Sequence, residues 1–588
     1  MRTIAIDSIR RAVIAGVVVA AACGPGPRAD DGPAVGELRV EPDHAVITIT
    51  DGAVTAQAYK AFVRQADGTD RDVTSDVVFS VAASSLGTFS GPTLVPSGLA
   101  GPFAVSGTYG DAHASVDGTI LVVKHTVTPP APSNSPGLFD AAADDPVFSP
   151  AIAYPSPGTM FPPNLGDFDV HWTADAAHTL FEVTLEGPYA TMKVYVTSIQ
   201  AFVFAPADWA VVADSTRGRD LKIRVRALDP SHPAYAGKRE IGAILADGDV
   251  VGGIYYWSLS QAAVGIYRHD FADASTPPEP YYTTAISPHN WCVACHALSA
   301  DGTRIGVSSS QTGAGGIVQM GFTLNAATRT PMSPTDESVV WDFATFNPDA
   351  SLMATVMSGQ LTLRAADTGA VVQQVSTAPA SWVTHPDWSP LGDKLAYTAL
   401  DGTYGNDLSV GPNCRISIRS FDAGTRTFGT PGNLVTPSSG CAYYPNFSPD
   451  GAWILYDQSQ NGTYSDNTAM VSIVPADGST PGAVLSTPNL AGTRNSWPRW
   501  TPFQQDLHYT DTAGVLHTEP VLWFTFSTTR AFGTRAPAGT PQIWMAPFFP
   551  NRQHAGLDPS APAFRLPFQD LQSNNHAAQW THQVVSIQ

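Results

Sequence analysis

Residues 446–454 read Asn446-Phe-Ser-Pro-Asp-Gly-Ala-Trp-Ile454: an aromatic residue, then Ser-Pro-Asp-Gly, then an apolar run. Related units recur through the second half of the chain, and we call the second residue of each unit its anchor. The anchors are Leu298, Phe346, Trp388, Phe447 and Trp500. They lie 48, 42, 59 and 53 residues apart, which leaves room for four short strands in each unit. Repeats of this period predict the blades of a β-propeller.

A truncated sixth unit, Ala578-Gln-Trp-Thr581, lies near the end of the sequence, with Trp580 as its anchor. If it supplies the innermost strand of a blade begun elsewhere, it closes the ring and removes the open sheet edges. Residues 290–588 therefore predict a six-bladed propeller. In the complete unit, Pro449-Asp-Gly451 is typical of a tight turn, and a turn role is favoured over calcium binding because no unit supplies a dense set of oxygen ligands. The repeat resembles that of TolB-like propellers.

The anchors align the units, and equivalent positions in a ring converge on one face. The residues three before the anchors are Cys295, Phe343, His385, Tyr444, Trp497 and Ala577, with His576 one position further back. We expect them at the mouth of the central channel, where propellers bind ligands, with Tyr444 and Trp497 in the ligand rim. For His385 and His576 taken singly, a hydrogen bond to a loop carbonyl is the alternative.

The segment Cys292-Val-Ala-Cys295-His296 has the spacing of a c-type haem attachment motif,. In the proteins that it resembles, the two thiols bond to the haem vinyl groups and the histidine ligates the iron. The resemblance implies a haem c cofactor attached to Cys292 and Cys295, with His296 as the proximal iron ligand. His576 is the first candidate for the distal iron ligand, and His385 or a methionine such as Met357 is the alternative.

Three other interpretations of this motif stay open. A disulfide between Cys292 and Cys295 suits an oxidising compartment. A redox-active pair similar to that of thioredoxin would lack the usual βαβ surroundings, and a zinc site would still need a fourth ligand. The motif lies at the edge of a β-repeat, whereas a small helical bundle normally surrounds a c-type haem.

Two further domains are predicted before the propeller. Residues 35–125 alternate apolar and polar residues in short runs, which predicts a β-sandwich, and the order of these runs resembles bacterial immunoglobulin-like domains. The Pro-rich residues 126–148 predict a linker. Residues 149–265 predict a second sandwich, whose last segment, Gly253–Leu259, resembles the final strand of fibronectin type III-like domains. Residues 266–289 are assigned as a connector.

The N-terminus carries an export signal. Three arginines precede the apolar run 12–22, which is too short to cross a bilayer and predicts a signal peptide over residues 1–22,. Ala20-Ala-Ala-Cys23 resembles the lipobox of bacterial lipoproteins, which implies that Cys23 is lipidated and that residues 23–34 form a tether. An ordinary signal peptide is the alternative. The expected location is a bacterial cell envelope, lipid-anchored, facing the periplasm or the outer membrane.

Composition limits the remaining choices. The chain has 588 residues, and its formal net charge of −20 argues against nucleic acid as a partner,. The 50 glycines and 49 prolines favour turns over helices,. The prediction is an all-β chain: two β-sandwich domains followed by a six-bladed β-propeller. In an oxidising envelope, Cys414 and Cys441 are expected to form a disulfide.

Two functions are carried forward from the sequence. The first is electron transfer or redox sensing by one c-type haem at the propeller mouth, with a redox partner that the sequence does not name. The second is a binding module without redox chemistry, which holds a protein, peptide or glycan at the mouth and in which Cys292 and Cys295 are structural. An enzyme ranks third, because the sequence has no Gly-x-Ser-x-Gly, His-Glu-x-x-His or phosphate-loop motif,.

Overall fold

The computed structural model describes residues 36–197, 199–260, 263–273, 276–313, 316–402, 411, 413–510 and 515–587. The predicted signal peptide, Cys23 and the tether lie outside these ranges. Strands dominate, and the α-helices of the described ranges are short: α1 (Ser135–Ala141), α2 (Pro206–Thr216) and α3 (Pro550–His554). Among the described residues, no helix is long and apolar enough to span a bilayer.

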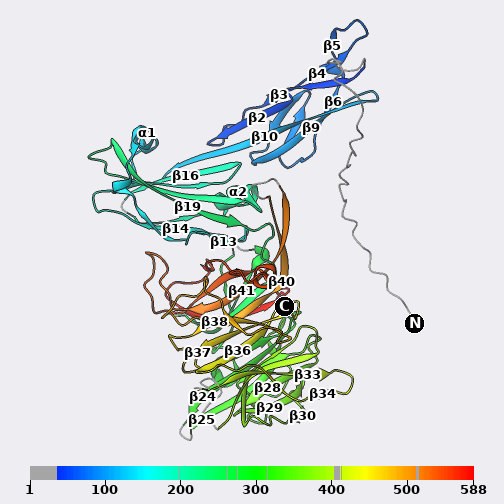
Figure 1. The fold of residues 1–588 in the computed structure, drawn as a ribbon, viewed down its shortest axis with the longest axis vertical. Helices are drawn as coiled ribbons and strands as arrows, with labels where there is room; N and C mark the ends of the chain where they lie inside the picture. Colours follow the sequence, from blue (N-terminus) through cyan, green and yellow to red (C-terminus); the bar gives the residue numbers. More distant parts are fainter. Residues whose placement is uncertain are drawn as a thin grey trace.

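The C-terminal half is a ring of six antiparallel sheets, which confirms the predicted fold class (Figure 1). The innermost strands are β44 (Asn574–Thr581), β23 (Cys292–Leu298), β27 (Phe343–Phe346), β31 (Trp382–Trp388), β36 (Cys441–Phe447) and β40 (Ser496–Thr510). Each contacts the next around the ring, and β44 contacts β23, so the ring is closed. A closed ring gives every blade a neighbour on both sides and leaves only short, protected strand edges.

We letter the blades A to F in the order of the inner strands β44, β23, β27, β31, β36 and β40. In blades B to F the outer strands follow the inner strand in sequence order. Blade B continues with β24 (Arg304–Gly313), β25 (Gly316–Asn325) and β26 (Thr330–Pro331), and blade C with β28 (Leu352–Met357), β29 (Gln360–Ala365) and β30 (Val371–Val375). Blade D continues with β32 (Lys394–Leu400), β33 (Arg415–Asp422), β34 (Thr427–Phe428) and β35 (Gly432–Val435). Blade E continues with β37 (Trp453–Ser459), β38 (Met470–Pro475) and β39 (Ala483–Val484), and blade F with β41 (Leu516–Thr528), β42 (Gln542–Phe548) and β43 (Phe564–Arg565).

Blade A joins the two ends of the propeller. The C-terminal strand β44 pairs with β20 (Gly253–Leu259), which continues into β21 (Val264–Asp270) and β22 (Glu279–Thr283). The structure therefore differs from the predicted boundaries: Gly253–Leu259 is a propeller strand, and residues 266–289 supply outer strands instead of a connector. The reason is that β44 ends the ring with an inner strand only, so its hairpin partner must come from the segment that enters the propeller.

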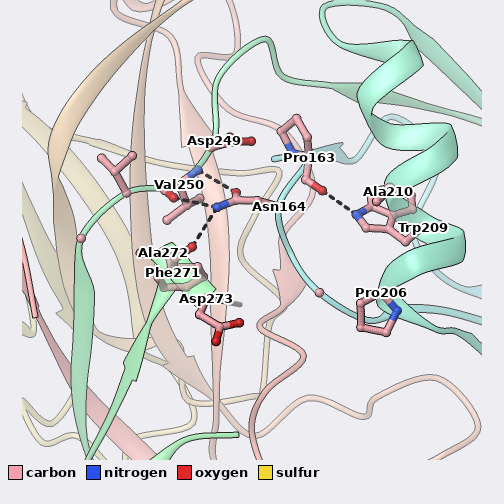
Figure 2. Close-up of a pocket in the computed structure, with 13 residues that line it drawn as sticks. Pro163, Asn164, Pro206, Trp209, Ala210, Asp249, Val250, Phe271, Ala272 and Asp273 are labelled. Carbon is pink, nitrogen blue, oxygen red and sulfur yellow. Dashed lines mark hydrogen bonds between the residues drawn. The ribbon is translucent and has the colours of Figure 1, made fainter. Parts of the chain in front are cut away.

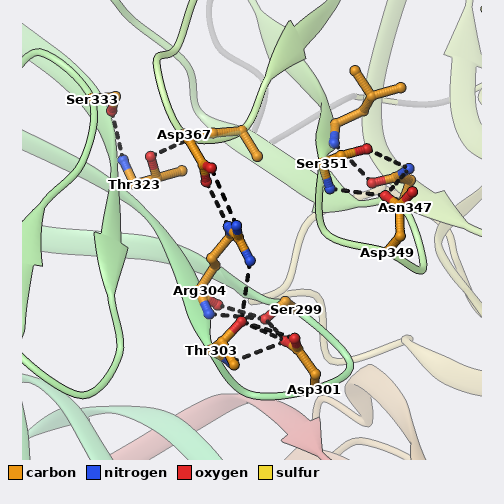
Figure 3. Close-up of polar contacts among 12 residues, drawn as sticks. Ser299, Asp301, Thr303, Arg304, Thr323, Ser333, Asn347, Asp349, Ser351 and Asp367 are labelled. Atoms are coloured by element: carbon orange, nitrogen blue, oxygen red, sulfur yellow. Dashed lines mark hydrogen bonds and ion pairs between the residues drawn. The ribbon is translucent and has the colours of Figure 1, made fainter.

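The Asp residues of the repeat organise the turns after the inner strands, as Figure 3 shows for blades B and C. In blade B, the Ser299 hydroxyl donates to Asp301 Oδ1 (2.6 Å), and the Thr303 amide donates to the same oxygen (3.0 Å). In blade C, the Ser351 amide donates to Asp349 Oδ1 (2.9 Å). Carboxylate-to-amide bonds of this kind hold a turn locally.

The first sandwich comprises β1 (Leu38–Glu41), β2 (His44–Thr50), β3 (Gln57–Ala58), β4 (Lys60–Arg64), β5 (Asp70–Asp72), β6 (Val78–Val81), β7 (Gly87–Ser90), β8 (Thr93–Pro96), β9 (Gly101–Tyr109) and the first part of β10 (Ala112–Val127). The end of β10 pairs in parallel with β16 (Ala190–Thr197) of the second sandwich, so one sheet runs through both domains. The predicted linker is structured: Phe139 of α1 packs 5.9 Å from the Tyr195 ring, because the Pro-rich stretch also carries apolar residues that need burial,.

The second sandwich comprises β11 (Ala143–Asp144), β12 (Ala151–Tyr154), β13 (Met160–Phe161), β14 (Phe168–Thr173), β15 (Leu180–Glu186), β16 (Ala190–Thr197), β17 (Ala201–Phe204), β18 (Asp220–Leu228) and β19 (Tyr235–Leu245). It packs on the propeller beside the long strand β40 (Figure 1). Phe161 packs 5.0 Å from the Phe564 ring of blade F, and Arg535 pairs with the buried Asp169 at 2.6 Å. The second sandwich and the propeller therefore share one apolar core.

Candidate functional site

A small cavity of about 30 Å³ lies inside the propeller channel and gathers the six positions aligned from the sequence. Its lining includes Cys295, Phe343, His385, Tyr444, Trp497 and Ala577. The rings pack on one another: His385 lies 4.0 Å from Tyr444 and 4.6 Å from Phe343, and Tyr444 lies 5.1 Å from Trp497. We call these four rings the aromatic plug, because they fill the channel at this level.

The backbone explains why these side chains face the channel. His385, Tyr444, Trp497 and Ala577 all have a left-handed backbone, with φ between 49° and 56°. Each lies where the pairing of its inner strand shifts register, which is a β-bulge,. Each such residue costs about 1 kcal/mol, and strain of this kind gathers at functional sites. The bulge recurs in four blades, so the ring builds it as a shared feature.

Next to the plug, the channel widens into a funnel of about 410 Å³. All six blades contribute their anchors to its lining, together with the residue before each anchor: Ala297, Thr345, Asp387, Asn446, Arg499 and Gln579. Prolines from the turns also line it: Pro348, Pro390, Pro449 and Pro502. Since proline restricts the backbone, the wall of this funnel is largely preformed.

Charged groups lie where the funnel meets the plug. Asp387 accepts hydrogen bonds from the side-chain amide of Asn446 (3.0 Å) and the backbone amide of Phe447 (2.7 Å). Burial raises the pKa of Asp387 to about 6, an effect that the positive charge of Arg499 opposes,. Arg499 lines both the funnel and the plug cavity. Neither Asp387 nor Arg499 was predicted as a site residue from the sequence, although both directly precede an anchor.

A buried carboxyl supports the plug from behind. Asp457 is fully buried in blade E, and its Oδ2 accepts a hydrogen bond from the Ser496 hydroxyl (2.7 Å) and another from the backbone amide of Trp497 (3.1 Å). Burial raises the pKa of Asp457 well above its ordinary value,. This carboxyl thus fixes the strained backbone of Trp497, and the sequence analysis did not identify it.

The Cys-x-x-Cys-His motif lies on β23, the inner strand of blade B. Cys292 is exposed at the end of the strand away from the funnel, whereas Cys295 faces the plug cavity, and no disulfide joins the two in the described structure. His296 is buried, its Nε2 lies 3.3 Å from the Tyr255 carbonyl oxygen, and its Nδ1 finds no hydrogen-bond partner among the described residues. Burial lowers the pKa of His296 to about 4,.

These surroundings do not fit a haem. Sites for ligands of drug size occupy about 300–1,000 Å³, whereas the space beside Cys295 is about 30 Å³ and is bounded by the aromatic plug. The two thiols also diverge, since Cys292 lies at the surface and Cys295 in the channel. We therefore derive no chemistry through a haem from this structure.

The two candidate distal histidines lie in different places. His385 belongs to the plug, where its Nδ1 is 3.3 Å from the Thr398 hydroxyl. His576 borders a separate cavity of about 10 Å³ with Tyr464 and Trp497, and its Nδ1 is 2.8 Å from Asn574 Oδ1. Burial lowers the pKa of His576 to about 4,. Neighbouring residues on a strand point to opposite sides, so the His576 side chain points away from the channel that Ala577 faces,.

The predicted disulfide between Cys414 and Cys441 is present, with 4.5 Å between the two Cα atoms. It links the start of β33 in blade D to the start of β36 in blade E. Within the described ranges, no three His, Cys, Asp or Glu side chains group as a metal site would require.

A second cavity of about 410 Å³ lies between the second sandwich and blade A, and Figure 2 shows its lining. The Asn164 side chain bridges the two domains: its amide donates to the carbonyls of Val250 (2.8 Å) and Phe271 (3.3 Å), and its oxygen accepts from the Val250 amide. The Trp209 indole donates to the Pro163 carbonyl. These polar groups bond to one another, so we rank this cavity behind the funnel.

Comparisons with known proteins add little about function. No protein-family profile matches the chain, and no curated protein matches it. Among solved structures, a putative TolB from Agrobacterium tumefaciens shares 14% identity over 57% of this chain and 99% of its own, with a TM-score of 0.32. TolB from Acinetobacter baumannii shares 12% over 61% and 79%, with a TM-score of 0.35. The periplasmic gluconolactonase of Pseudomonas aeruginosa shares 13% over 56% and 98%, with a TM-score of 0.30. Likeness at this level carries no argument about activity, and the propeller assignment rests on the ring of strands.

Proposed function

We propose that this chain is an envelope-anchored binding protein whose propeller funnel holds a protein, peptide or glycan. The observation that carries the proposal is the funnel itself, a 410 Å³ recess to which every blade contributes equivalent residues. A volume of this size lies within the range of ligand sites.

The geometry favours binding over transport through the ring. The aromatic plug reduces the channel to about 30 Å³, so a ligand enters from the funnel side and stops there. The proline-rich wall is rigid before binding, which lowers the entropy cost of holding a ligand. Polar side chains at the floor and apolar anchors above them suit a ligand with one polar end.

The rest of the chain supports a place at the membrane surface. Under this proposal Cys23 carries a lipid, residues 23–34 act as a tether, and the two sandwiches hold the propeller away from the bilayer. The support is the lipobox-like sequence and the continuous sheet through β10 that joins the sandwiches. The immunoglobulin-like and fibronectin-like resemblances stay predictions.

A ligand screen with two matched variants tests the binding function. Thermal-shift measurements with panels of peptides and oligosaccharides should find at least one stabilising class, since a ligand of the native state raises the melting temperature. Ala300 is exposed and lines the funnel, so Ala300→Trp should abolish the shift. Ala423 is exposed on an outer turn of blade D, and Ala423→Trp should leave it unchanged. A shift that survives Ala300→Trp would contradict the proposal.

Covalent haem is the second candidate, and the spacing of Cys292, Cys295 and His296 is the observation that favours it,. It requires side chains of the aromatic plug to move, because the space beside Cys295 is too small. Expression with haem-maturation machinery distinguishes the two: a Soret band that survives acid-acetone extraction would favour haem, and its absence would favour the binding protein.

A further inference from the structure

Arg499 carries a half-buried positive charge where the funnel meets the plug. Its guanidinium lies between the funnel and the plug cavity, and the hydrogen bond that it makes within the described residues goes from Nη1 to the neighbouring Pro498 carbonyl (3.0 Å). In the part of the chain that the structure describes, Arg499 forms no ion pair within 4 Å. Burial lowers the pKa of Arg499, which means that its positive charge is held at a cost,.

The acidic groups near Arg499 accept hydrogen bonds from other residues. Both carboxylate oxygens of Asp387 accept hydrogen bonds, one from Asn446 and one from Phe447. Asp457 accepts hydrogen bonds from Ser496 and Trp497 behind the plug. Both carboxyl groups attract Arg499 only from a distance. Asp301, at the funnel edge, accepts hydrogen bonds inside its own turn. The guanidinium therefore keeps most of its five donors for a ligand.

A second polar group lies beside this cation without a side-chain bond. Gln579 lines both the funnel and the plug cavity, as Arg499 does. Among the described residues, its side-chain amide makes no hydrogen bond. Thr345 is on the same ring, and its hydroxyl oxygen accepts from the Trp388 amide (3.2 Å), which leaves its proton to donate. The guanidinium of Arg499, the amide of Gln579 and the hydroxyl of Thr345 thus occupy equivalent positions around the funnel, each directly before an anchor.

We propose that Arg499 binds the free carboxylate at the end of a peptide chain that enters the funnel. The proposal rests on the binding function assigned to the funnel and names its ligand. A carboxylate matches the planar guanidinium fork with two parallel hydrogen bonds. A phosphate would bring a second negative charge towards Asp387 and Asp301, whereas Arg499 is the one arginine or lysine among the described residues that line the funnel. The preceding peptide groups meet Gln579 and Thr345, and the apolar anchors contact the side chains above.

Binding of short peptides tests this assignment by isothermal titration calorimetry. The probes are N-acetyl-Ala-Leu-Ala with a free carboxylate, the same peptide as its C-terminal amide, and glucuronic acid as a carboxylate from a sugar. We expect the free acid to bind at least about tenfold more tightly than the amide, because hydrogen bonds to charged groups are the strong ones. Arg499→Gln should weaken the acid about tenfold and leave the amide unchanged, and Arg499→Lys should retain part of the affinity.

The control keeps the change in charge but moves it away from the funnel. Arg494 borders the small cavity beside His576 and bonds to Asn467, so Arg494→Gln should bind like the unmodified protein. Arg499→Gln should also melt at the same or a higher temperature, because it removes a half-buried charge that forms no ion pair within the described residues,. A marked fall in melting temperature would show instead that Arg499 serves the fold.

The outcomes separate this inference from the function on which it rests. If the amide binds as tightly as the acid and Ala300→Trp blocks both, the funnel binds ligands but the carboxylate assignment is wrong. If glucuronic acid binds through Arg499 and the peptide acid does not, the assignment of the ligand as a peptide is wrong. If neither peptide binds, the inference is overturned, and the thermal-shift screen decides the binding function alone. If the acid binds and neither Arg499→Gln nor Ala300→Trp affects it, both proposals fail.

Discussion

A single backbone position in each inner strand decides what faces the channel. At His385, Tyr444 and Trp497 the left-handed residue precedes a proline, and the bulge turns its ring inward. The residue two positions later lines the funnel instead: Asp387, Asn446 and Arg499. The ring thus carries an aromatic layer and a polar layer, set by positions two residues apart on the same strand faces.

Acid sensitivity is expected from the buried His296. Burial holds the pKa of His296 in the folded protein near 4, below the ordinary value of 6.5, so the unfolded chain binds a proton first as the pH falls,. Above about pH 6.5 the neutral His296 does not lower the free energy of unfolding. Between pH 6.5 and 4 that free energy falls by up to about 3 kcal/mol because the unfolded chain binds the proton,. His296→Gln keeps a donor for Tyr255 and should reduce the fall in melting temperature between pH 7.5 and 4.5.

The exposed His232 provides the matched control, and His232→Gln should melt like the unmodified protein at both pH values. An equal loss of stability in His296→Gln and the unmodified protein would show that other groups cause the acid sensitivity.

At the level of whole strands, closure of the ring depends on β44. This strand lies between β20 and the inner strands of its neighbours, and its Trp580 indole donates to Thr525 of blade F. The chain therefore joins its last strand to a strand more than 300 residues earlier, and non-local pairings of this kind slow folding,.

Deleting residues 574–588 removes β44 and should expose the edge of β20 and the faces of blades B and F. We expect aggregation or loss of the cooperative unfolding transition, because open apolar edges favour association. Circular dichroism melting and size-exclusion chromatography measure this. Deletion of residues 24–35, at the other end of the chain, is the control and should leave the transition intact. Normal melting of the C-terminal deletion would show that the ring does not close through β44.

The Cys414–Cys441 disulfide should stabilise the link between blades D and E. Replacing both cysteines with serine should lower the free energy of unfolding by about 3 kcal/mol, because the bond restricts a loop of 27 residues in the unfolded chain,. Urea unfolding followed by tryptophan fluorescence measures the change. The two cysteines of β23 offer a matched pair: Cys292→Ser with Cys295→Ser should lower the free energy of unfolding much less, and an equal cost in the two double variants would contradict the structure.

At the scale of the whole molecule, the second sandwich and the propeller are fastened by a buried contact. Asp169 is buried in β14, lies 3.2 Å from His171 Nε2 and pairs with Arg535 of the propeller. The Phe161–Phe564 contact adds apolar area beside it. A shared core of this kind predicts that the two domains unfold together.

Arg535→Ala should lower the free energy of unfolding by about 1–2 kcal/mol, because it leaves the buried Asp169 with fewer partners. Arg239 is exposed on β19, and Arg239→Ala is the control with no expected change. Urea titration of both variants decides this, and equal stability of Arg535→Ala and Arg239→Ala would argue against a fastened interface.

The sequence predicted the architecture better than the site. The repeat unit around Phe447 was enough to predict six blades, and the alignment on the anchors placed the six channel residues together. The start of the propeller was missed because β20, β21 and β22 carry no anchor of their own: the anchor of that blade, Trp580, lies at the other end of the chain. The space beside Cys295 depends on how four rings pack, which residue spacing does not encode.

The central claim is that ligands bind at the funnel and not at the Cys292–His296 motif. Calorimetry with a ligand from the screen, on Ala300→Trp and on the Cys292→Ser, Cys295→Ser double variant, tests it most directly. Ala300→Trp is expected to abolish binding, and the double variant is expected to bind like the unmodified protein. Binding that survives Ala300→Trp and disappears in the double variant would place the ligand at the motif instead of the funnel.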